Sequence, residues 1–108
     1  MYEKTITLEP LNDRAKSFYA KAHINKAYYE HSCLETLTSY DTDVLAVVYH
    51  EIDEPTVFKL WGGYSSTTMR HVNEYLSQNG LNGGGKKWWD SLPLSDESDA
   101  KDSAREQW

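Results

Sequence analysis

The spacing of apolar residues is clearest in the middle of the chain, where it follows the period of an α-helix. Met69, Val72 and Leu76 lie three and four positions apart, which places them on one side of a helix, with Tyr75 beside them. We therefore predict a helix over residues 66–78 that packs on a core through this side. The polar positions expected to face water are the following: Arg70, Asn73, Glu74 and Ser77.

The residues at both ends of this segment are typical of helix ends. Ser65 or Ser66 can accept hydrogen bonds from the free amides of a first helical turn. Gly80 suits the left-handed conformation that often closes a helix, because glycine has no Cβ to clash. The boundary signals therefore agree with the periodicity.

Runs of β-branched and apolar residues predict strands before this helix. The most hydrophobic run, residues 44–49, should be a central strand. A turn at residues 53–56 should bring residues 57–61 back antiparallel to it. Residues 5–8 form another short β-prone run, which Pro10 ends.

Residues 17–24 admit two interpretations. Apolar and polar side chains alternate there as in a strand, but residues 13–16 resemble a capped helix start. We favour the strand, followed by a turn at residues 25–26. A second strand is then predicted at residues 27–33, with extended structure continuing through residues 34–40.

The C-terminal part of the chain is poor in apolar residues. The segment after the predicted helix is flexible by its glycine content, and between Leu94 and Trp108 no apolar side chain is larger than alanine. Residues 94–108 hold five acids against two basic residues. We therefore expect a single folded domain over residues 1–93 and a disordered acidic tail over residues 94–108.

These elements together predict an α+β fold: a small antiparallel sheet of four or five strands with one principal helix on one face. With 108 residues, one modest core is expected. The single cysteine, Cys33, excludes an internal disulfide and fits a reducing cytoplasm. No apolar run has the length of a membrane span, so we expect a cytoplasmic protein.

The composition favours binding over catalysis. A net charge of −6 disfavours a simple phosphate-binding surface, while 13% aromatic residues supply many possible interface anchors. A basic pair beside two indoles could hold single-stranded nucleic acid or anchor a protein, and the tail acids could contact a basic surface. The candidate partner-binding residues are Arg70, Lys86, Lys87, Trp88, Trp89, Asp96, Glu97 and Asp99.

No catalytic centre, cofactor or metal ion is predicted. The four histidines and Cys33 lack the spacing of metal ligands. Residues 65–68 could cradle a phosphate at a helix start, but the glycines ahead of them do not form a phosphate-binding loop, and a helix cap is the favoured interpretation. The carboxylates near the predicted turns are solvated, so their pKa values should not be separated as acid–base catalysis requires.

Three segments together are characteristic: residues 17–22 (SFYAKA), residues 37–44 (LTSYDTDV) and residues 63–80 (GYSSTTMRHVNEYLSQNG). They resemble a family of small uncharacterised domains of bacteriophages, prophages and their bacterial hosts, in which a SYDT strand and turn precedes a YSxTTxRHxxEFLxQNG helix. This chain has Tyr75 where phenylalanine is common and Ser66 where alanine is common. The resemblance covers roughly residues 17–89 and implies no established activity.

The resemblance implies that the protein acts on host machinery. Small acidic phage proteins include anti-CRISPR and other anti-defence inhibitors, which this chain is similar to in size and charge by analogy only. The leading hypothesis is a non-enzymatic phage-type protein that binds and inhibits or modulates a host protein, such as a nucleic-acid-processing CRISPR effector. The alternative is a small nucleic-acid-binding protein that uses the following residues: Arg70, Lys86, Lys87, Trp88 and Trp89.

Overall fold

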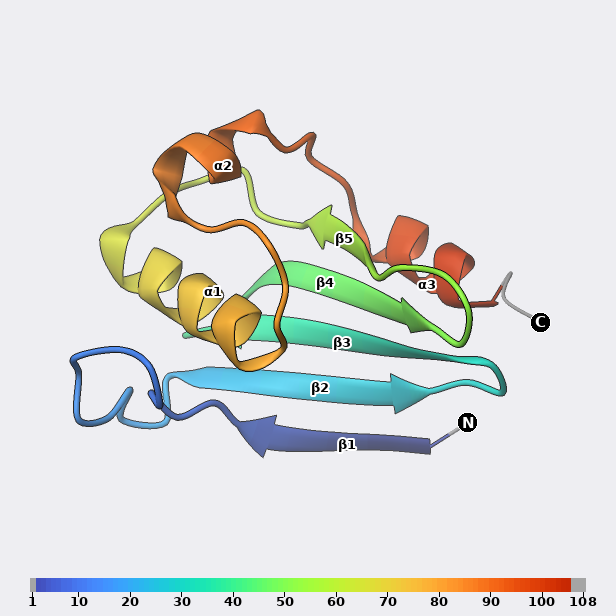
Figure 1. Ribbon diagram of the computed structural model, residues 1–108, viewed down its shortest axis with the longest axis horizontal. Helices are drawn as coiled ribbons and strands as arrows, with labels where there is room; N and C mark the ends of the chain where they lie inside the picture. The colour runs from blue at the N-terminus through green and yellow to red at the C-terminus, as the bar shows by residue number, and fades with distance from the viewer. Residues whose placement is uncertain (1, 106–108) are drawn as a thin grey trace.

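A five-stranded antiparallel sheet is the frame of the fold (Figure 1). The computed structural model describes residues 2–105, and within them the strands lie side by side in chain order. They are β1 (Tyr2–Thr7), β2 (Ala22–Tyr28), β3 (Ser32–Ser39), β4 (Thr42–His50) and β5 (Thr56–Lys59). The predicted α+β class and antiparallel sheet are confirmed, and residues 44–49 lie in β4, an interior strand of the sheet.

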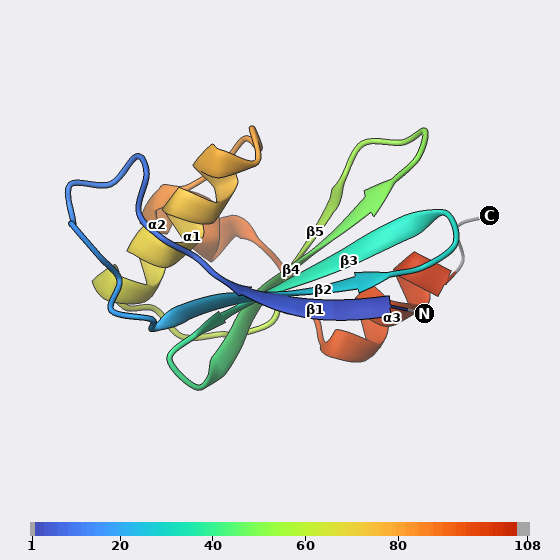
Figure 2. The same cartoon turned by 90° about the horizontal axis from the view of Figure 1, so that it is seen from below.

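Three helices follow the sheet in the described part of the chain: α1 (Ser66–Gln78), α2 (Gly85–Ser91) and α3 (Glu97–Arg105). Figure 2 shows α1 and α2 on one face of the sheet and α3 on the opposite face, toward the other end of the strands. We call these the α1 face and the α3 face. No helix among the described residues is long and apolar enough to cross a membrane.

Alternate strand residues supply the cores of the two faces, as the two-residue period of a strand requires. The core of the α1 face includes Ile24, Leu37, Leu45 and Val47 from the sheet, with Met69, Val72, Leu76 and Trp89 from the helices. The core of the α3 face consists of Ala27, Leu34, Ala46, Val48, Ala100 and Ala104. Both faces of the sheet are therefore covered over part of their area.

The bounds and caps predicted for α1 are confirmed. The hydroxyl of Ser65 accepts a hydrogen bond from the amide of Thr68 at 3.1 Å. Gly80 closes the helix with a left-handed φ of 65°. The predicted solvent exposure of Glu74 is wrong, because its carboxylate is buried and accepts hydrogen bonds from the backbone and side-chain amides of Asn12. The loop before β2 thus covers this side of α1.

The turn predicted at residues 25–26 is wrong, because both residues lie within β2. Asn25 exchanges side-chain hydrogen bonds with Thr5 and Glu3 of β1, and Lys26 forms an ion pair with Glu35 of β3 at 3.6 Å. Cross-strand partners thus hold two turn-prone residues in extended conformation. Residues 17–21, predicted as part of a strand, belong to the preceding loop.

The disordered tail predicted from residue 94 onward is also wrong where the structure describes it, because residues 97–105 form α3. Asp96 and Asp99 cap this helix reciprocally, each carboxylate accepting the other residue's amide. Ala100 and Ala104, four positions apart, are fully buried against the sheet. Trp108, another apolar residue of the predicted tail, lies outside the described residues.

Candidate partner-binding site

A groove opens where the first turn of α1 meets the loop before β2 and the turn between β3 and β4. It encloses about 570 Å³. The residues that give it its character are Phe18, Tyr19, Lys21, Tyr40, Arg70 and His71. We call it the α1 groove. It joins three segments that lie far apart in the sequence, so only the folded chain forms it.

Two tyrosines on the rim of the α1 groove combine exposure with an unfavourable backbone conformation. The side chains of Tyr19 and Tyr40 are 78% and 51% exposed. Their φ angles are 52° and 56°, and that of Ala20 is 57°, in the left-handed region that favours glycine. Backbone strain of this kind persists only where the surrounding structure enforces it, and it is concentrated at functional sites.

Backbone hydrogen bonds hold this rim in place. The amide of Tyr40 donates to the carbonyl of Lys21 at 2.7 Å, which ties the β3–β4 turn to the loop before β2. The amide of Tyr19 donates to the hydroxyl of Ser17 at 2.8 Å, and that of Lys21 to the carbonyl of Phe18 at 2.9 Å. The two tyrosine rings are therefore presented from a braced loop and turn.

The floor of the groove is apolar and aromatic. His71 is 1% exposed, and its ring meets Phe18 edge-on with centroids 4.6 Å apart. Burial lowers the pKa of His71 and so favours the neutral form of the ring. Its Nδ1 lies 2.7 Å from the hydroxyl of Ser39, which also contacts Thr68. Because Ser39 is itself buried, its hydroxyl is enclosed by these partners and faces no substrate.

The rim of the groove is basic although the chain is acidic. Lys21 and Arg70 are exposed, and the guanidinium of Arg70 lies 3.7 Å from the carboxylate of Asp13. The first turn of α1 contains no acidic residue, and the N-terminus of a helix carries positive potential. Two aromatic rings beside two cations can hold a planar or apolar group together with an anionic one.

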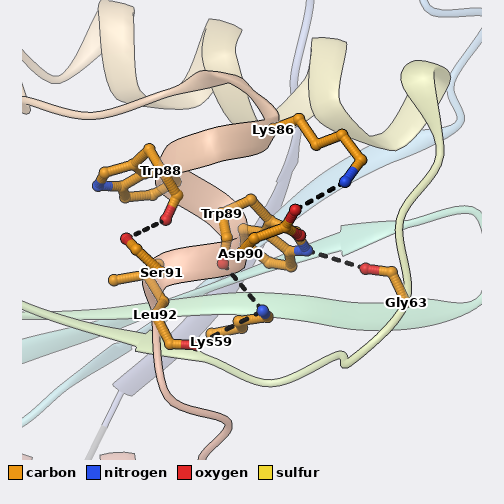
Figure 3. Close-up of polar contacts among 8 residues, drawn as sticks. All are labelled: Lys59, Gly63, Lys86, Trp88, Trp89, Asp90, Ser91 and Leu92. Atoms are coloured by element: carbon orange, nitrogen blue, oxygen red, sulfur yellow. Dashed lines mark hydrogen bonds and ion pairs between the residues drawn. The ribbon is translucent and has the colours of Figure 1, made fainter.

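The two tryptophans predicted to bind a partner lie on α2, and Trp89 serves the core (Figure 3). Trp89 is 1% exposed, and its indole donates to the carbonyl of Gly63 at 2.8 Å. The ammonium of Lys59 donates to the Trp89 carbonyl at 2.9 Å and lies 5.0 Å from the centre of its ring. In this conformation the indole of Trp89 is closed to a partner.

Trp88 and the two lysines are more accessible than Trp89. Trp88 is half-buried and lies over Gly83, whose φ of 123° and close approach leave no room for a side chain. The ammonium of Lys86 donates to Asp90 at 2.7 Å (Figure 3), and this contact raises the pKa of Lys86. Lys87 is exposed. A partner-binding role for Trp88 and Lys87 stays a prediction.

The other predicted residues are divided between two places. Arg70 lies on the α1 groove, where its ion pair is with Asp13 rather than with α2. Asp96 and Asp99 cap α3, and the carboxyl of Glu97 lies within hydrogen-bonding reach of Asp43 on β4. The structure therefore does not bring the eight residues together as one surface.

Sequence reasoning missed Tyr19, Lys21 and Tyr40 as a site. The chain holds eight tyrosines, and nothing in the local sequence of Tyr19 and Tyr40 distinguishes them from the tyrosines inside strands. The left-handed backbone conformations of Tyr19 and Tyr40 occur in a loop and a turn that β2–β3 pairing brings together. The available signal was the location of Tyr40 in the predicted SYDT strand and turn.

Comparison with known proteins places the chain in a family but supplies no activity. A search of curated proteins and a search of solved structures each gave no match. A family model described as a family of unknown function, DUF8033, matches residues 6–91. This match begins near the end of β1, includes the other four strands, α1 and α2, and ends before α3. The chain therefore belongs to the DUF8033 family of unknown function.

Proposed function

We propose that this protein is a non-enzymatic interaction protein that binds a host protein through the α1 groove and thereby inhibits or modulates it. The observation that carries the proposal is the pair of exposed tyrosines, Tyr19 and Tyr40, held in left-handed backbone on one braced rim. Tyrosine is favoured at protein interfaces because it supplies a large contact area with few rotatable bonds. Phe18 and His71 provide an apolar floor between them.

Charge favours a protein over a nucleic acid as the partner. The groove offers Lys21 and Arg70 within a chain of net charge −6, which is few cations for a phosphate backbone. A protein segment that presents an apolar or aromatic side chain with an adjacent carboxylate would match the rings and the basic rim. The nucleic-acid alternative loses one of its two predicted stacking indoles, since Trp89 is buried.

The sequence resemblance to phage and prophage domains suggests that the partner is a host protein. The two proteins would then meet in the host cytoplasm. A nucleic-acid-processing defence enzyme, such as a CRISPR effector, is the target class that the analogy with small acidic anti-defence proteins suggests. An inhibitor of that kind acts by occupying a surface that its target needs. The α1 groove would then supply the anchor of the complex.

A site-specific crosslinking experiment tests this proposal. A photoreactive phenylalanine analogue at position 19 or 40 of the full chain is irradiated in host lysate, and the same analogue at position 2 is the control. Tyr2 is also an exposed tyrosine, at 62%, but it lies on β1. Positions 19 and 40 should give one shared protein adduct that position 2 does not give.

A binding panel identifies the competing outcome. Single- and double-stranded DNA and RNA are titrated at low salt against the wild-type chain, Tyr19→Ala and Lys21→Glu. The competing outcome is submicromolar nucleic-acid binding that both variants abolish, together with the absence of a shared protein adduct. This result would show that the groove binds nucleic acid instead of a protein. Identical adducts from positions 2, 19 and 40 would show that the groove has no special role.

A further inference from the structure

α3 lies outside the residues that the family model matches and covers one face of the sheet. The family match ends at residue 91, and α3 begins at Glu97. Beneath the helix lies an apolar strip of the α3 face, formed by Ala27, Leu34, Ala46 and Val48 and edged by Tyr29, Phe58 and Leu60. Figure 2 shows α3 against this face. The strip is therefore covered by a helix that follows the matched residues.

The side chains that α3 buries against this strip are small. They are two alanines, Ala100 and Ala104, which fill little volume. The docking is completed by the hydroxyl of Ser32, which donates to the carbonyl of Ala104 at 2.8 Å, and by the amide of Ser95, which donates to the carbonyl of Lys59 at 2.7 Å. A cleft of about 310 Å³ remains between α3 and the sheet.

One docking contact joins two acids. The carboxyl of Glu97 on α3 lies within hydrogen-bonding reach of Asp43 on β4, which also accepts from the hydroxyl of Thr38 at 2.6 Å. The Asp43 carboxylate raises the pKa of Glu97, and the same contact lowers the pKa of Asp43. When neither is protonated, two negative charges face each other across the interface. At the position of Glu97, α3 is therefore a poor electrostatic match for its own docking site.

The charged residues that line the cleft indicate which kind of helix would be more complementary to the sheet than α3 is. The sheet contributes two charged residues to its lining, Glu3 and Asp43, and both are acids. The cations of the lining, Lys101 and Arg105, both come from α3. A helix that kept these cations and placed a third in the position of Glu97 would be complementary to the sheet along its whole contact.

We propose that the sheet face beneath α3 is a second docking surface, for a basic amphipathic helix of a partner protein with small residues four positions apart. α3 is its resident occupant, and the incoming helix displaces it. The small residues are required because Ala100 and Ala104 approach the strands closely, and the basic residues because the sheet side of the cleft is acidic. This surface is distinct from the α1 groove, so the two proposals stand independently.

A peptide competition experiment tests the inference on the full chain. The probe is a fluorescent peptide that copies residues 95–105 with the change Glu97→Lys. The matched control peptide carries Asp102→Lys, which makes the same charge change on an exposed position of the same helix. Fluorescence anisotropy should show the Glu97→Lys peptide binding about threefold or more tighter than the control, as expected for one added ion pair.

Two further readouts locate the binding. Hydrogen exchange of the α3 amides should become faster when the Glu97→Lys peptide binds, because the resident helix is released. A chain that itself carries Glu97→Lys should bind the peptide more weakly than wild type, since its own α3 then pairs with Asp43. Tyr40→Ala in the α1 groove should leave peptide affinity unchanged.

The proposal is overturned by any of three results. These are equal affinity of the two peptides, binding without faster exchange of α3, and no binding at millimolar peptide concentration. Any of these results would leave the proposal for the α1 groove standing, because that proposal is tested separately by crosslinking at positions 19 and 40.

Discussion

The amide of Tyr40 donates a hydrogen bond to the carbonyl of Lys21 at 2.7 Å, and this bond joins the β3–β4 turn to the loop before β2. It fixes the distance between two loops that each carry an exposed tyrosine. Because the hydrogen bond uses the backbone, the side chains of Tyr19 and Tyr40 can be changed without removing it. Stability and partner binding should therefore separate at these positions.

The first prediction concerns the two rim tyrosines. Tyr19→Asn and Tyr40→Asn should each change the free energy of unfolding by less than about 0.5 kcal/mol, because asparagine tolerates the left-handed conformation and both rings are largely exposed. Each should strongly reduce capture of the partner protein. Urea denaturation and a pull-down measure the two effects, with Tyr2→Asn as the control. A loss of several kcal/mol would mean that the rings serve the fold.

The second prediction concerns the adjacent tryptophans of α2. Trp89→Ala should lower the free energy of unfolding by about 3–5 kcal/mol, because the indole is buried and its N–H donates to Gly63. Lys87→Ala, at an exposed position on the same helix, is the control and should change it by less than about 0.5 kcal/mol. Thermal and chemical denaturation give the values. A stable Trp89→Ala protein with reduced partner binding would restore the role predicted for this residue from sequence.

The third prediction concerns the pH dependence of α3 docking. The pKa of Glu97 is raised by Asp43 in the docked state, so docking is favoured by the shared proton. The stabilisation from Glu97 is complete below its undocked pKa and is lost as the pH rises through its docked pKa. The pKa of Asp43 is lowered in the docked state, so the contribution of Asp43 to docking has the opposite pH dependence. It is lost as the pH falls through the docked pKa of Asp43.

Glu97→Gln tests this pH dependence, because an amide keeps a hydrogen-bond donor toward Asp43 at every pH. Hydrogen exchange of the α3 amides in wild type should accelerate, beyond the intrinsic base-catalysed rate, as the pH rises above the mildly acidic range. In Glu97→Gln this extra acceleration should disappear, and in Asp102→Asn it should remain. Equal protection profiles in all three proteins would show that the carboxyl pair does not control docking.

The fourth prediction concerns the buried carboxylate of Glu74. Burial by itself would raise the pKa of Glu74, but hydrogen bonds from Gln78 and Asn12 lower it overall. Glu74→Ala should cost about 1–3 kcal/mol, because the amide of Asn12 loses its acceptor and the loop before β2 loses a tie to α1. Denaturation and hydrogen exchange of residues 8–21 measure this. Ser77→Ala, an exposed position on the same helix, should be nearly neutral.

The sequence by itself determined the elements whose signals are local. The bounds of α1 could be predicted because its cap at Ser65, its apolar positions and its closing Gly80 all lie within one short segment. The central strand β4 could be predicted because an uninterrupted run of β-branched and apolar residues suits a strand buried on both faces. Short-range sterics and hydrogen bonding suffice for such elements.

The tertiary structure decided everything that depends on a distant partner. Asn25 is extended because of its hydrogen bonds to β1, and Glu74 is buried because of the loop around Asn12. α3 forms with two alanines as its buried side chains because the sheet supplies the rest of the interface.

The candidate site belongs to this second class. Trp89 became core, and Tyr19 and Tyr40 became neighbours on one rim, through contacts between residues about 20 or more positions apart. A sequence pattern reports the conformation that a segment favours alone. It does not report which segments meet, because that depends on the free energy of packing the whole chain.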